Sequence, residues 1–459
     1  MDFNKINKVY FLGIGGIGMS ALARYFLAHG KEVAGYDRTS TPLTGEMVKQ
    51  GMKIHFEDAV DNIPKNYLKQ DDTLIIRTPA VPEDHAEYRY FAEKGYHILK
   101  RAQVLGLIFN TFKGVAIAGT HGKTSVTTFT TFLLNQCGID CSAFLGGISK
   151  NFNSNLVLGK SDVVVAEADE FDRSFLQLNP FISLVTTVDA DHLDIYKDFE
   201  DVRNTFQKFI SQTHAGGTVI LKKGVNLEVP SSCSKLTYAL DNSSADIFAS
   251  DIKIEDGNYS FTLNTPDGKV EGLRLTIPGR TNIENSVAAM AVCYAMGIDI
   301  GKFVKVLPGL KGVVRRFDIQ YQDEKCIYID DYAHHPRELD AVIGSLRDLY
   351  KGRKITGIFQ PHLYSRTRDF ANDFVKSLSA LDELILLDIY PAREKPLPGV
   401  TSDMLFEKID LSRKYRCSKI NLLNTLKELN IDVLLTVGAG DIDQMIAPIK
   451  DYLSNREEH

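Results

Sequence analysis

The chain has 459 residues, of which 44% are hydrophobic and 24% charged, and its formal net charge is −6. This length predicts two or three domains of about 150 residues each, and an acidic balance without a long basic run argues against a nucleic-acid-binding protein. The six cysteines form no C-x-x-C pair, and no apolar run reaches the roughly 18 residues of a membrane span. The start of the chain does not resemble a signal peptide, so we expect a cytoplasmic protein with reduced thiols.

The first predicted unit is a strand over residues 8–12, a glycine-rich turn over 13–18 and a helix over 19–29. A second strand, 32–37, ends in Asp37, about 20 residues further on. This pattern is typical of dinucleotide-binding folds, in which the turn closes on a diphosphate and the acid accepts from a ribose hydroxyl. Glycines needed only for packing are the alternative, and the pattern does not separate NAD from a nucleotide sugar. The candidate diphosphate ligands are Gly15, Gly16, Ile17 and Gly18.

Further strands are predicted over 73–76 and 96–99, with a helix over 84–94 between them. The first of these strands ends in the rigid loop Thr78-Pro79-Ala80-Val81-Pro82. Ligands of parallel α/β sheets bind beyond the carboxyl ends of the strands. We therefore expect Thr78, Pro79 and Ala80 to lie on the same rim as the glycine-rich turn.

A second strand–turn–helix unit begins with the apolar residues 115–118 and continues as a helix over 126–136. Its turn reads Gly119-Thr120-His121-Gly122-Lys123-Thr124-Ser125. Main-chain N–H groups, the lysine charge and a hydroxyl for Mg²⁺ suit a triphosphate. A full P-loop pattern would require glycine where the chain has Ile117, so an ordinary strand-to-helix turn with a solvated lysine is the alternative.

Two buried strand patterns later in the chain end in acids. Residues 161–166 lead to Glu167-Ala168-Asp169-Glu170-Phe171-Asp172, and 182–188 lead to Asp189-Ala190-Asp191-His192-Leu193-Asp194. A carboxylate at a strand end, in the same sheet as a phosphate-binding turn, is where a nucleotide-bound Mg²⁺ finds a protein ligand. Because His192 lies between Asp191 and Asp194, the site of a Zn²⁺ or Mn²⁺ hydrolase is one alternative. A solvated acidic loop is another.

From 217 to about 277 the chain has short β-like runs, with a hairpin turn predicted at 256–258. A helix predicted over 287–296 follows, and Asn282 and Asn285 share one face at its start. Their amides could read an adenine edge, but capping of the helix is the simpler explanation.

The last segment begins with a hinge-like stretch that contains Arg315 and Arg316. Predicted strands at 326–329, 354–359, 383–387 and 433–437 indicate another parallel α/β unit. His and Arg residues follow two of these strands, which favours carboxylate or phosphate binding, with a surface salt-bridge network as the alternative. These candidates are His334, His362, Arg366 and Arg368.

Taken in order, these stretches closely resemble the Mur ligases of peptidoglycan synthesis over essentially the whole chain. The stretches that carry the resemblance are 13–20, 118–124, 167–172 with Ser174 and Phe175, 191–194, 315–317, 331–336 and 359–369. Each motif is weak alone, but the ordered set is very specific.

The resemblance implies an α/β enzyme of three domains: a Rossmann-like UDP-sugar-binding domain over 1–110, a P-loop ATPase-like domain with a small β region over 111–312, and a Rossmann-like domain over 313–459 that closes over ATP and binds the amino acid. The implied reaction joins L-alanine to the lactyl carboxylate of UDP-N-acetylmuramate through an acyl phosphate. It would use ATP and Mg²⁺, which Mn²⁺ could replace, with no nucleic acid or membrane partner, as a monomer or homodimer.

The resemblance also assigns residues to roles. The diphosphate would be held by the first glycine-rich turn, with Asp37 and the Thr78 loop. The residues implied for ATP are Gly119, Thr120, His121, Gly122, Lys123, Thr124, Ser125, Asn282, Asn285, Arg315, Arg316 and Asp331. The implied metal ligands are Thr124, Glu167 and His192, and the amino acid would lie near His334, His362, Arg366 and Arg368. The implied catalytic set is Lys123, Glu167, His192, Arg316, His334 and Arg366.

Two positions depart from the family pattern: Thr281 replaces the usual His before Asn282, and Leu363 replaces an Arg after His362. The alternatives are a recycling ligase that adds a tripeptide to the same UDP-sugar, folylpolyglutamate synthase, an NAD-dependent dehydrogenase and a non-catalytic nucleotide-binding regulator. The recycling ligase carries an insertion after the acidic motif that this chain lacks, and the synthase lacks the first glycine-rich domain.

Overall fold

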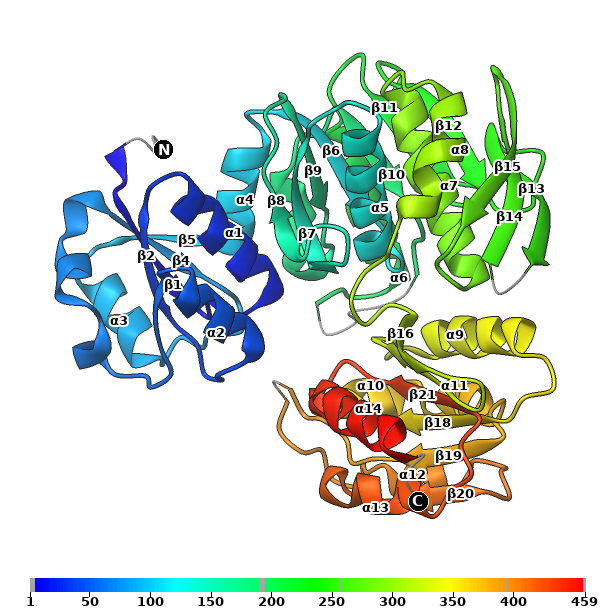
Figure 1. Ribbon diagram of the computed structural model, residues 1–459. Helices are drawn as coiled ribbons and strands as arrows, with labels where there is room; N and C mark the ends of the chain where they lie inside the picture. The colour runs from blue at the N-terminus through cyan, green and yellow to red at the C-terminus, as the bar shows by residue number, and fades with distance from the viewer. Residues whose placement is uncertain (1–4, 190–194, 256–257, 393, 457–459) are drawn as a thin grey trace. The chain divides into compact units, whose positions relative to one another are not determined.

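The computed structural model describes residues 5–189, 195–255, 258–392 and 394–456. In these residues three sheets follow one another along the chain, coloured blue, cyan to green, and yellow to red in Figure 1. Helices alternate with the strands, so the predicted α/β class with three domains is confirmed. Of the helices described, none is both long and apolar enough to cross a membrane.

The first sheet is parallel, with strand order β3-β2-β1-β4-β5. Side chains alternate across it: Val9 and Phe11 of β1 face the core that contains α1 and α4, and Tyr10 and Leu12 face the core that contains α3. The two faces are therefore both covered, as in doubly wound folds. The elements are β1 (Lys8–Leu12), α1 (Ile17–Ala28), β2 (Glu32–Tyr36), α2 (Pro42–Lys49), β3 (Lys53–His55), β4 (Thr73–Arg77), α3 (Ala86–Glu93), β5 (His97–Lys100) and α4 (Arg101–Phe109).

The second sheet has the order β15-β14-β13-β12-β11-β10-β6-β9-β7-β8. The strand before the phosphate-binding turn, β6, pairs in parallel with β10 and β9, the two strands that end in acids. The elements are β6 (Lys113–Ala118), α5 (Lys123–Gln136), β7 (Ser142–Ser149), β8 (Ser154–Val157), β9 (Val163–Glu167), β10 (Ile182–Val185), α6 (Phe199–Ser211), β11 (Thr218–Lys222), β12 (Ser234–Ala239), β13 (Ile247–Glu255), β14 (Asn258–Thr265), β15 (Gly268–Leu275), α7 (Arg280–Ala295) and α8 (Phe303–Val306).

Two helices of this region begin earlier than the sequence pattern predicts. Helix α5 begins at Lys123 rather than at 126. Its first turn therefore includes Thr124 and Ser125, which are buried in the fold and adopt a helical backbone although their side chains are polar. Helix α7 begins at Arg280 rather than at 287, directly after Pro278-Gly279, so Asn282 and Asn285 lie inside it. The predicted hairpin turn falls partly on residues 256 and 257, which lie outside the described residues; its flanking strands β13 and β14 are neighbours in the sheet.

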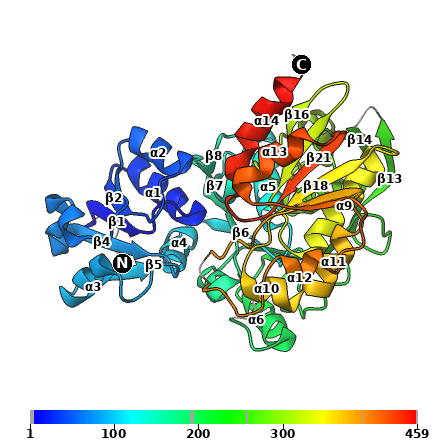
Figure 2. The same cartoon turned by 90° about the horizontal axis from the view of Figure 1, so that it is seen from below.

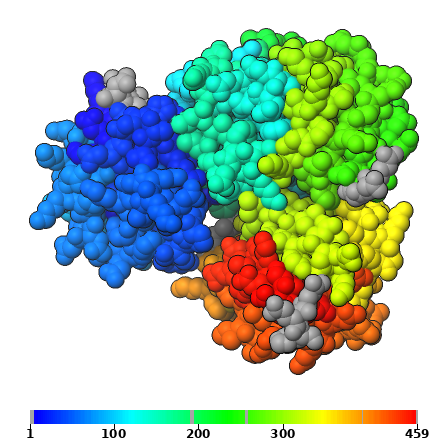
Figure 3. Space-filling model, in the orientation of Figure 1, coloured from blue at the N-terminus to red at the C-terminus, as the bar shows by residue number. Residues whose placement is uncertain are grey.

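The third sheet has the order β16-β17-β21-β18-β19-β20, and β17, β21, β18, β19 and β20 are parallel. Its two faces carry separate cores, one with α9, α11 and α12 and the other with α13 and α14. Figure 2 shows α11 and α12 on one side of this sheet and α13 and α14 on the other. Helix α14, drawn red, is on the surface in Figure 3. The elements are β16 (Asp318–Gln322), β17 (Ile327–Asp331), α9 (Pro336–Leu349), β18 (Ile355–Phe359), α10 (Tyr364–Asp369), α11 (Ala371–Leu378), β19 (Glu383–Leu386), α12 (Asp403–Phe406), β20 (Lys414–Arg416), α13 (Leu422–Lys427), β21 (Val433–Val437) and α14 (Ile446–Ser454).

A buried amide joins helix α1 of the first sheet to strand β8 of the second. Asn155 is fully buried, and its Nδ2 donates to Ile17 O at 2.7 Å and to Ser20 Oγ at 2.8 Å. Its Oδ1 accepts from Arg24 at 2.5 Å. Because an unpaired buried amide would be costly, this set of bonds fixes the β7–β8 hairpin against α1.

Candidate active site

The second glycine-rich turn has the backbone that a phosphate cradle requires. Gly119 and Gly122 have φ values of +131° and +83°, which favour glycine. A Cβ on Gly119 would lie 2.0 Å from Thr186 Oγ1, so no larger residue fits there without movement. Helix α5, which is described in full, has no acidic residue in its first turn and no side-chain cap. Its first N–H groups lack intrahelical partners and are thus available to an anion.

Residues that follow β10 form hydrogen bonds with this turn. The N–H of Thr120 donates to Thr187 O at 3.0 Å, and that of His121 donates to Thr187 Oγ1 at 3.1 Å. Thr120 Oγ1 in turn accepts from the N–H of Asp189 at 2.9 Å. The main-chain donors of Thr120 and His121 are therefore engaged with protein, which leaves phosphate contacts to the residues from Gly122 to Ser125.

Lys123 is held by an acid that the sequence pattern did not single out. Its Nζ lies 2.7 Å from Glu170 Oε2 and 3.0 Å from Glu170 Oε1, and it donates to Gly119 O at 2.7 Å. Burial alone would lower the pKa of Lys123, but the carboxylates of Glu170, Asp169 and Glu167 outweigh it and raise the pKa. The lysine therefore keeps its positive charge beside the turn.

Two hard oxygen donors meet at the start of α5. Thr124 Oγ1 donates to Glu167 Oε2 at 2.8 Å. A Cβ on Gly146 of β7 would lie 1.9 Å from the same carboxylate oxygen, so Glu167 occupies space that only a glycine leaves free. A hydroxyl and a carboxylate beside a phosphate-binding turn fit Mg²⁺, which prefers oxygen ligands. The third predicted metal ligand, His192, lies outside the described residues.

The predicted adenine-side amides have different surroundings. Asn282 Nδ2 donates to Pro278 O at 2.6 Å, so this bond is a side-chain donation to the carbonyl four residues earlier and not the cap of a free helix N–H. Asn285 is also buried, and its Oδ1 would lie 2.9 Å from a Cβ on Gly122. Asn285 is therefore within contact distance of the phosphate-binding turn.

The first glycine-rich turn and the Thr78 loop lie together, as predicted. A Cβ on Gly13, which has φ +89°, would lie 2.5 Å from Thr78 Cγ2. Asp37 Oδ2 accepts from the N–H of Gly15 at 2.7 Å, so its carboxylate closes the turn. The guanidinium of Arg77 donates to Val81 O at 2.8 and 3.0 Å and holds the loop. Gly16, Ile17, Pro79 and Ala80 are exposed on this rim, whereas Gly15, Gly18 and Thr78 are half-buried.

The two arginines of the hinge-like stretch differ. Arg315 has φ +62°, and its guanidinium pairs with the fully buried Asp330 at 2.9 Å and donates to Gly438 O at 2.7 Å. It is therefore committed to its own domain. Arg316 lies over the ring of Tyr332, 5.1 Å from the centroid, and is the better candidate for a phosphate contact.

Asp331, predicted on the ribose side, ends strand β17. Its carboxylate accepts from the N–H groups of Phe317 at 2.6 Å and of Ala333 at 2.8 Å. Burial raises the pKa of Asp331 to about 6, although Arg316 and these N–H groups oppose the shift. The carboxylate of Asp331 thus fixes the main chain at Phe317 and Ala333. Its remaining lone pairs could accept from a ribose hydroxyl.

Three of the four predicted amino-acid-binding side chains come together at the carboxyl ends of β17 and β18. The rings of His334 and His362 are 5.8 Å apart, and the charge of the buried Arg366 acts on His334. Burial lowers the pKa of His334, Glu338 opposes this, and Arg366 lowers it further, so the imidazole is neutral at pH 7. Arg368 differs: it is 55% exposed and pairs with Asp369 at 2.7 Å, because positions 366 and 368 point to different sides of α10.

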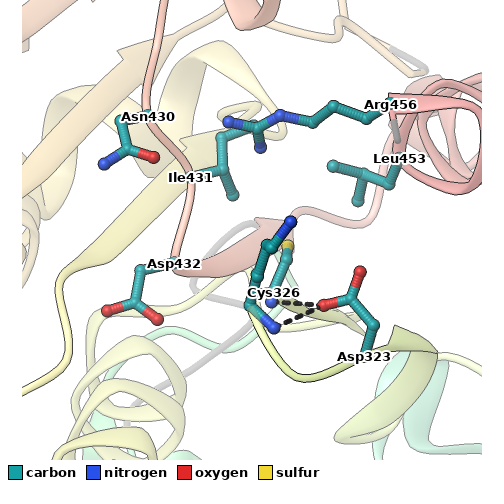
Figure 4. Close-up of a pocket in the computed structure, with 8 residues that line it drawn as sticks. Asp323, Cys326, Asn430, Ile431, Asp432, Leu453 and Arg456 are labelled. Carbon is teal, nitrogen blue, oxygen red and sulfur yellow. Dashed lines mark hydrogen bonds between the residues drawn. The ribbon is translucent and has the colours of Figure 1, made fainter. Parts of the chain in front are cut away.

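A cavity of about 410 Å³ lies at the other end of this sheet (Figure 4). Asp323 accepts from the N–H groups of Lys325 and Cys326 at its edge. Since six of its eight lining residues directly precede β17 or β21, the cavity is at the amino ends of these strands and does not belong to the candidate site. The lining residues are Asp323, Lys325, Cys326, Asn430, Ile431, Asp432, Leu453 and Arg456.

Several residues that contact the site were not predicted from the sequence. Glu170 lay within the acidic motif but had no distinguishing spacing. Gly146 stands in the Gly-Gly pair of β7, and glycine inside a strand often marks a close approach of another group. Thr186 and Thr187 follow β10 and could have been suspected only from their place at a strand end.

The chain is similar along its whole length to proteins of one family. Three family models match in order: Mur ligase family, catalytic domain (residues 8–113), Mur ligase middle domain (117–293) and Mur ligase, glutamate ligase domain (315–442). A UDP-N-acetylmuramate–L-alanine ligase of Porphyromonas gingivalis is 51% identical over 452 residues, which cover 98% of this chain and 99% of that protein.

Solved structures show the same fold. A UDP-N-acetylmuramate–alanine ligase of Thermotoga maritima superposes with a TM-score of 0.82 at 26% identity, covering 98% of this chain and 99% of the other. A murein peptide ligase of Psychrobacter arcticus gives 0.72 at 18% identity, with coverage of 98% and 99%. From the three ordered family models and the half-identical relative, the chain belongs to the Mur ligase family.

Proposed function

We propose that this protein joins L-alanine to the lactyl carboxylate of UDP-N-acetylmuramate with ATP, as a step in peptidoglycan precursor synthesis. The main support for the proposal is the phosphate-binding turn, where Lys123, Thr124 and Glu167 come together. The chain that carries this turn is 51% identical, over 452 residues, to a UDP-N-acetylmuramate–L-alanine ligase. The domain boundaries at 110/111 and 312/313 and the residue roles below are part of the proposal.

The first step activates a poor electrophile. The lactyl carboxylate attacks the γ-phosphate of ATP, the bond to ADP breaks, and an acyl phosphate forms. Negative charge grows on the phosphate oxygens, and the ammonium of Lys123 and the α5 N–H groups are placed to stabilise it. Mg²⁺ held by Thr124 and Glu167 would neutralise more of this charge, with Mn²⁺ as a substitute. Arg316 is our candidate for a further cation.

The second step forms the amide. The alanine amine attacks the acyl carbon, phosphate leaves, and the amine must lose a proton. His334 is neutral at pH 7, and its Nδ1 lies 3.0 Å from Tyr332 O, so Nδ1 carries the proton and Nε2 can accept one. Arg366 and His362 are placed to hold the alanine carboxylate.

Water would destroy the acyl phosphate, so we expect the C-terminal domain to close when substrates bind, bending near Gly312. Small-angle scattering should show a more compact particle with an ATP analogue and UDP-N-acetylmuramate than without them. An unchanged curve would count against closure. Because the reaction draws on ATP, we place it in the cytoplasm.

The decisive assay is phosphate release from ATP with UDP-N-acetylmuramate while the amino acid is varied. We expect release with L-alanine, and a product whose mass is that of the sugar nucleotide plus one alanine residue. Release with a tripeptide and none with alanine would instead identify a recycling ligase. Reduction of NAD⁺ by an alcohol, without phosphate release, would identify a dehydrogenase.

A further inference from the structure

Arg101 occupies a place between the two predicted nucleotide sites. It is the first residue of α4 and follows β5 directly, so it lies at the carboxyl edge of the first sheet, as the first glycine-rich turn does. Its side chain is 20% exposed, and NH2 lies 3.5 Å from Asp169 Oδ2 in the acidic loop after β9. None of the sequence motifs included it.

The side chain of Arg101 lies directly on the first turn of α1. A Cβ on Gly18 would be 2.9 Å from Arg101 NH1, 3.1 Å from Cδ and 3.4 Å from Cζ. Gly18 lies inside α1, and the space that a side chain would need there is filled by Arg101. It makes room for the guanidinium beside the helix end at which a diphosphate would bind.

Two carboxylates lie near this helix end: Asp37, which accepts from the N–H of Gly15, and Asp169, which faces Arg101. Helix α1 is described in full and has no acidic residue in its first turn, whereas the helix dipole already favours an anion there. Among the described residues, the one polar partner of the guanidinium is Asp169, at the long distance of 3.5 Å. A guanidinium has five donors, so most of its hydrogen-bonding capacity is unused.

We propose that Arg101 binds the diphosphate of the UDP-sugar, together with the main-chain N–H groups of the turn over 13–18. This inference rests on the proposed function and adds a side-chain ligand to a site otherwise built from backbone. A guanidinium suits the role because its planar fork bonds two phosphate oxygens at once. Arg101 would then contact the diphosphate and Asp169 at the same time. It would link the bound sugar nucleotide to the loop that carries Glu167 and Glu170.

Direct binding of three ligands tests the inference. UDP, UDP-N-acetylglucosamine and UDP-N-acetylmuramate share the diphosphate, but only the last has the lactyl carboxylate. Titration calorimetry with the full chain should show that Arg101→Met weakens all three by the same factor, about ten-fold or more. Arg101→Lys should recover part of the loss, since it restores the charge without the fork.

Matched variants separate ligand binding from a structural role. Lys100→Met removes the neighbouring cation, which pairs with Asp172 at 2.9 Å in the same loop, and should leave UDP binding unchanged. Asp169→Asn removes the negative charge that faces Arg101 and should not weaken UDP binding. If Asp169→Asn weakened it as much as Arg101→Met, Arg101 would act only as a bridge and the inference would be overturned.

Two further outcomes also overturn it: unchanged affinity in Arg101→Met, or a loss confined to UDP-N-acetylmuramate, which would place the guanidinium on the carboxylate. Failure of the unmodified protein to bind any of the three ligands would contradict the proposed function itself. Circular dichroism melting of each variant identifies any that are unfolded, and Arg101→Lys then provides the comparison.

Discussion

The two glycine-rich turns have the same plan, a buried strand followed by glycines and a helix, but opposite charges close on them. In the first turn an acid, Asp37, accepts from the N–H of Gly15. In the second a cation, Lys123, lies on the turn and is itself held by Glu170. The first turn thus presents mainly main-chain donors, whereas the second also presents an ammonium group, the kind of charge that phosphoryl transfer requires.

A glycine-rich turn offers main-chain N–H groups to an anion, while the neighbouring strand ends determine which charged side chains surround it. The strands beside β1 deliver the Thr78 loop and Asp37. The strands beside β6 deliver Glu167 and Asp189. Variants that act on one turn and not on the other can therefore test the assigned roles.

The largest expected effect is that of Lys123→Ala. Loss of the ammonium should lower kcat by about a thousand-fold, because a preorganised charge aimed at the transferring phosphate disappears. UDP binding should not change. Steady-state phosphate release and UDP titration measure the two effects. Lys208→Ala, an exposed lysine on α6, is the control, and normal turnover in Lys123→Ala would refute the site assignment.

Gly146→Ala should lower kcat by about a hundred-fold, since its Cβ would lie 1.9 Å from Glu167 Oε2 and must displace the carboxylate. The loss should appear as a raised Mg²⁺ requirement, measured by titrating the metal at saturating substrates. Gly45→Ala on α2, where nothing lies within 4 Å of the added Cβ, should be neutral. A wild-type metal dependence in Gly146→Ala would show that Glu167 does not act in metal binding.

Asp37→Ala should act on the first turn alone. Without its carboxylate the N–H of Gly15 loses a fixed partner, so we expect the KM for UDP-N-acetylmuramate to rise by about ten-fold. The KM for ATP should stay within two-fold, by the same order-of-magnitude argument. An equal rise in both KM values would mean that the two turns are not independent.

The smallest effect on turnover is expected at Glu87, a fully buried acid of the first domain. Tyr10 donates to it at 2.7 Å, and burial raises the pKa of Glu87 to about 7. The folded state therefore binds the extra proton between the ordinary pKa and about 7, so the free energy of unfolding should fall as pH rises through this window.

Glu87→Gln removes that titration and should be more stable than the unmodified protein at pH 8, by up to about 3 kcal/mol. The difference should vanish near pH 4. Urea unfolding at both pH values measures it, with the exposed Glu93 on the same helix as a control through Glu93→Gln. A constant difference between the two proteins across pH would show that Glu87 is ionised in the fold.

The sequence allowed both turns to be predicted because each is a local pattern: apolar strand, glycines, then helix-forming residues. The carboxylates at strand ends were predictable for the same reason, since parallel strands bring their carboxyl ends to one edge. Arg366 with His334 and His362 followed from their positions after β17 and β18.

The contacts that complete the site could not be predicted in this way. Glu170 on Lys123, Gly146 beside Glu167 and Arg101 on Gly18 each join segments that pack only in the folded chain. Arg315 was paired with Arg316 in the sequence, and its left-handed backbone and its ion pair with the buried Asp330 could not be predicted from that pattern.

The hairpin held by Asn155 has a mechanical consequence. The same hairpin begins with β7, and Gly146 of β7 lies against Glu167, so one hairpin contacts both α1 and the carboxylate that we propose for the metal. We therefore expect a substitution that loosens Asn155 from α1 to disturb the position of Glu167 as well.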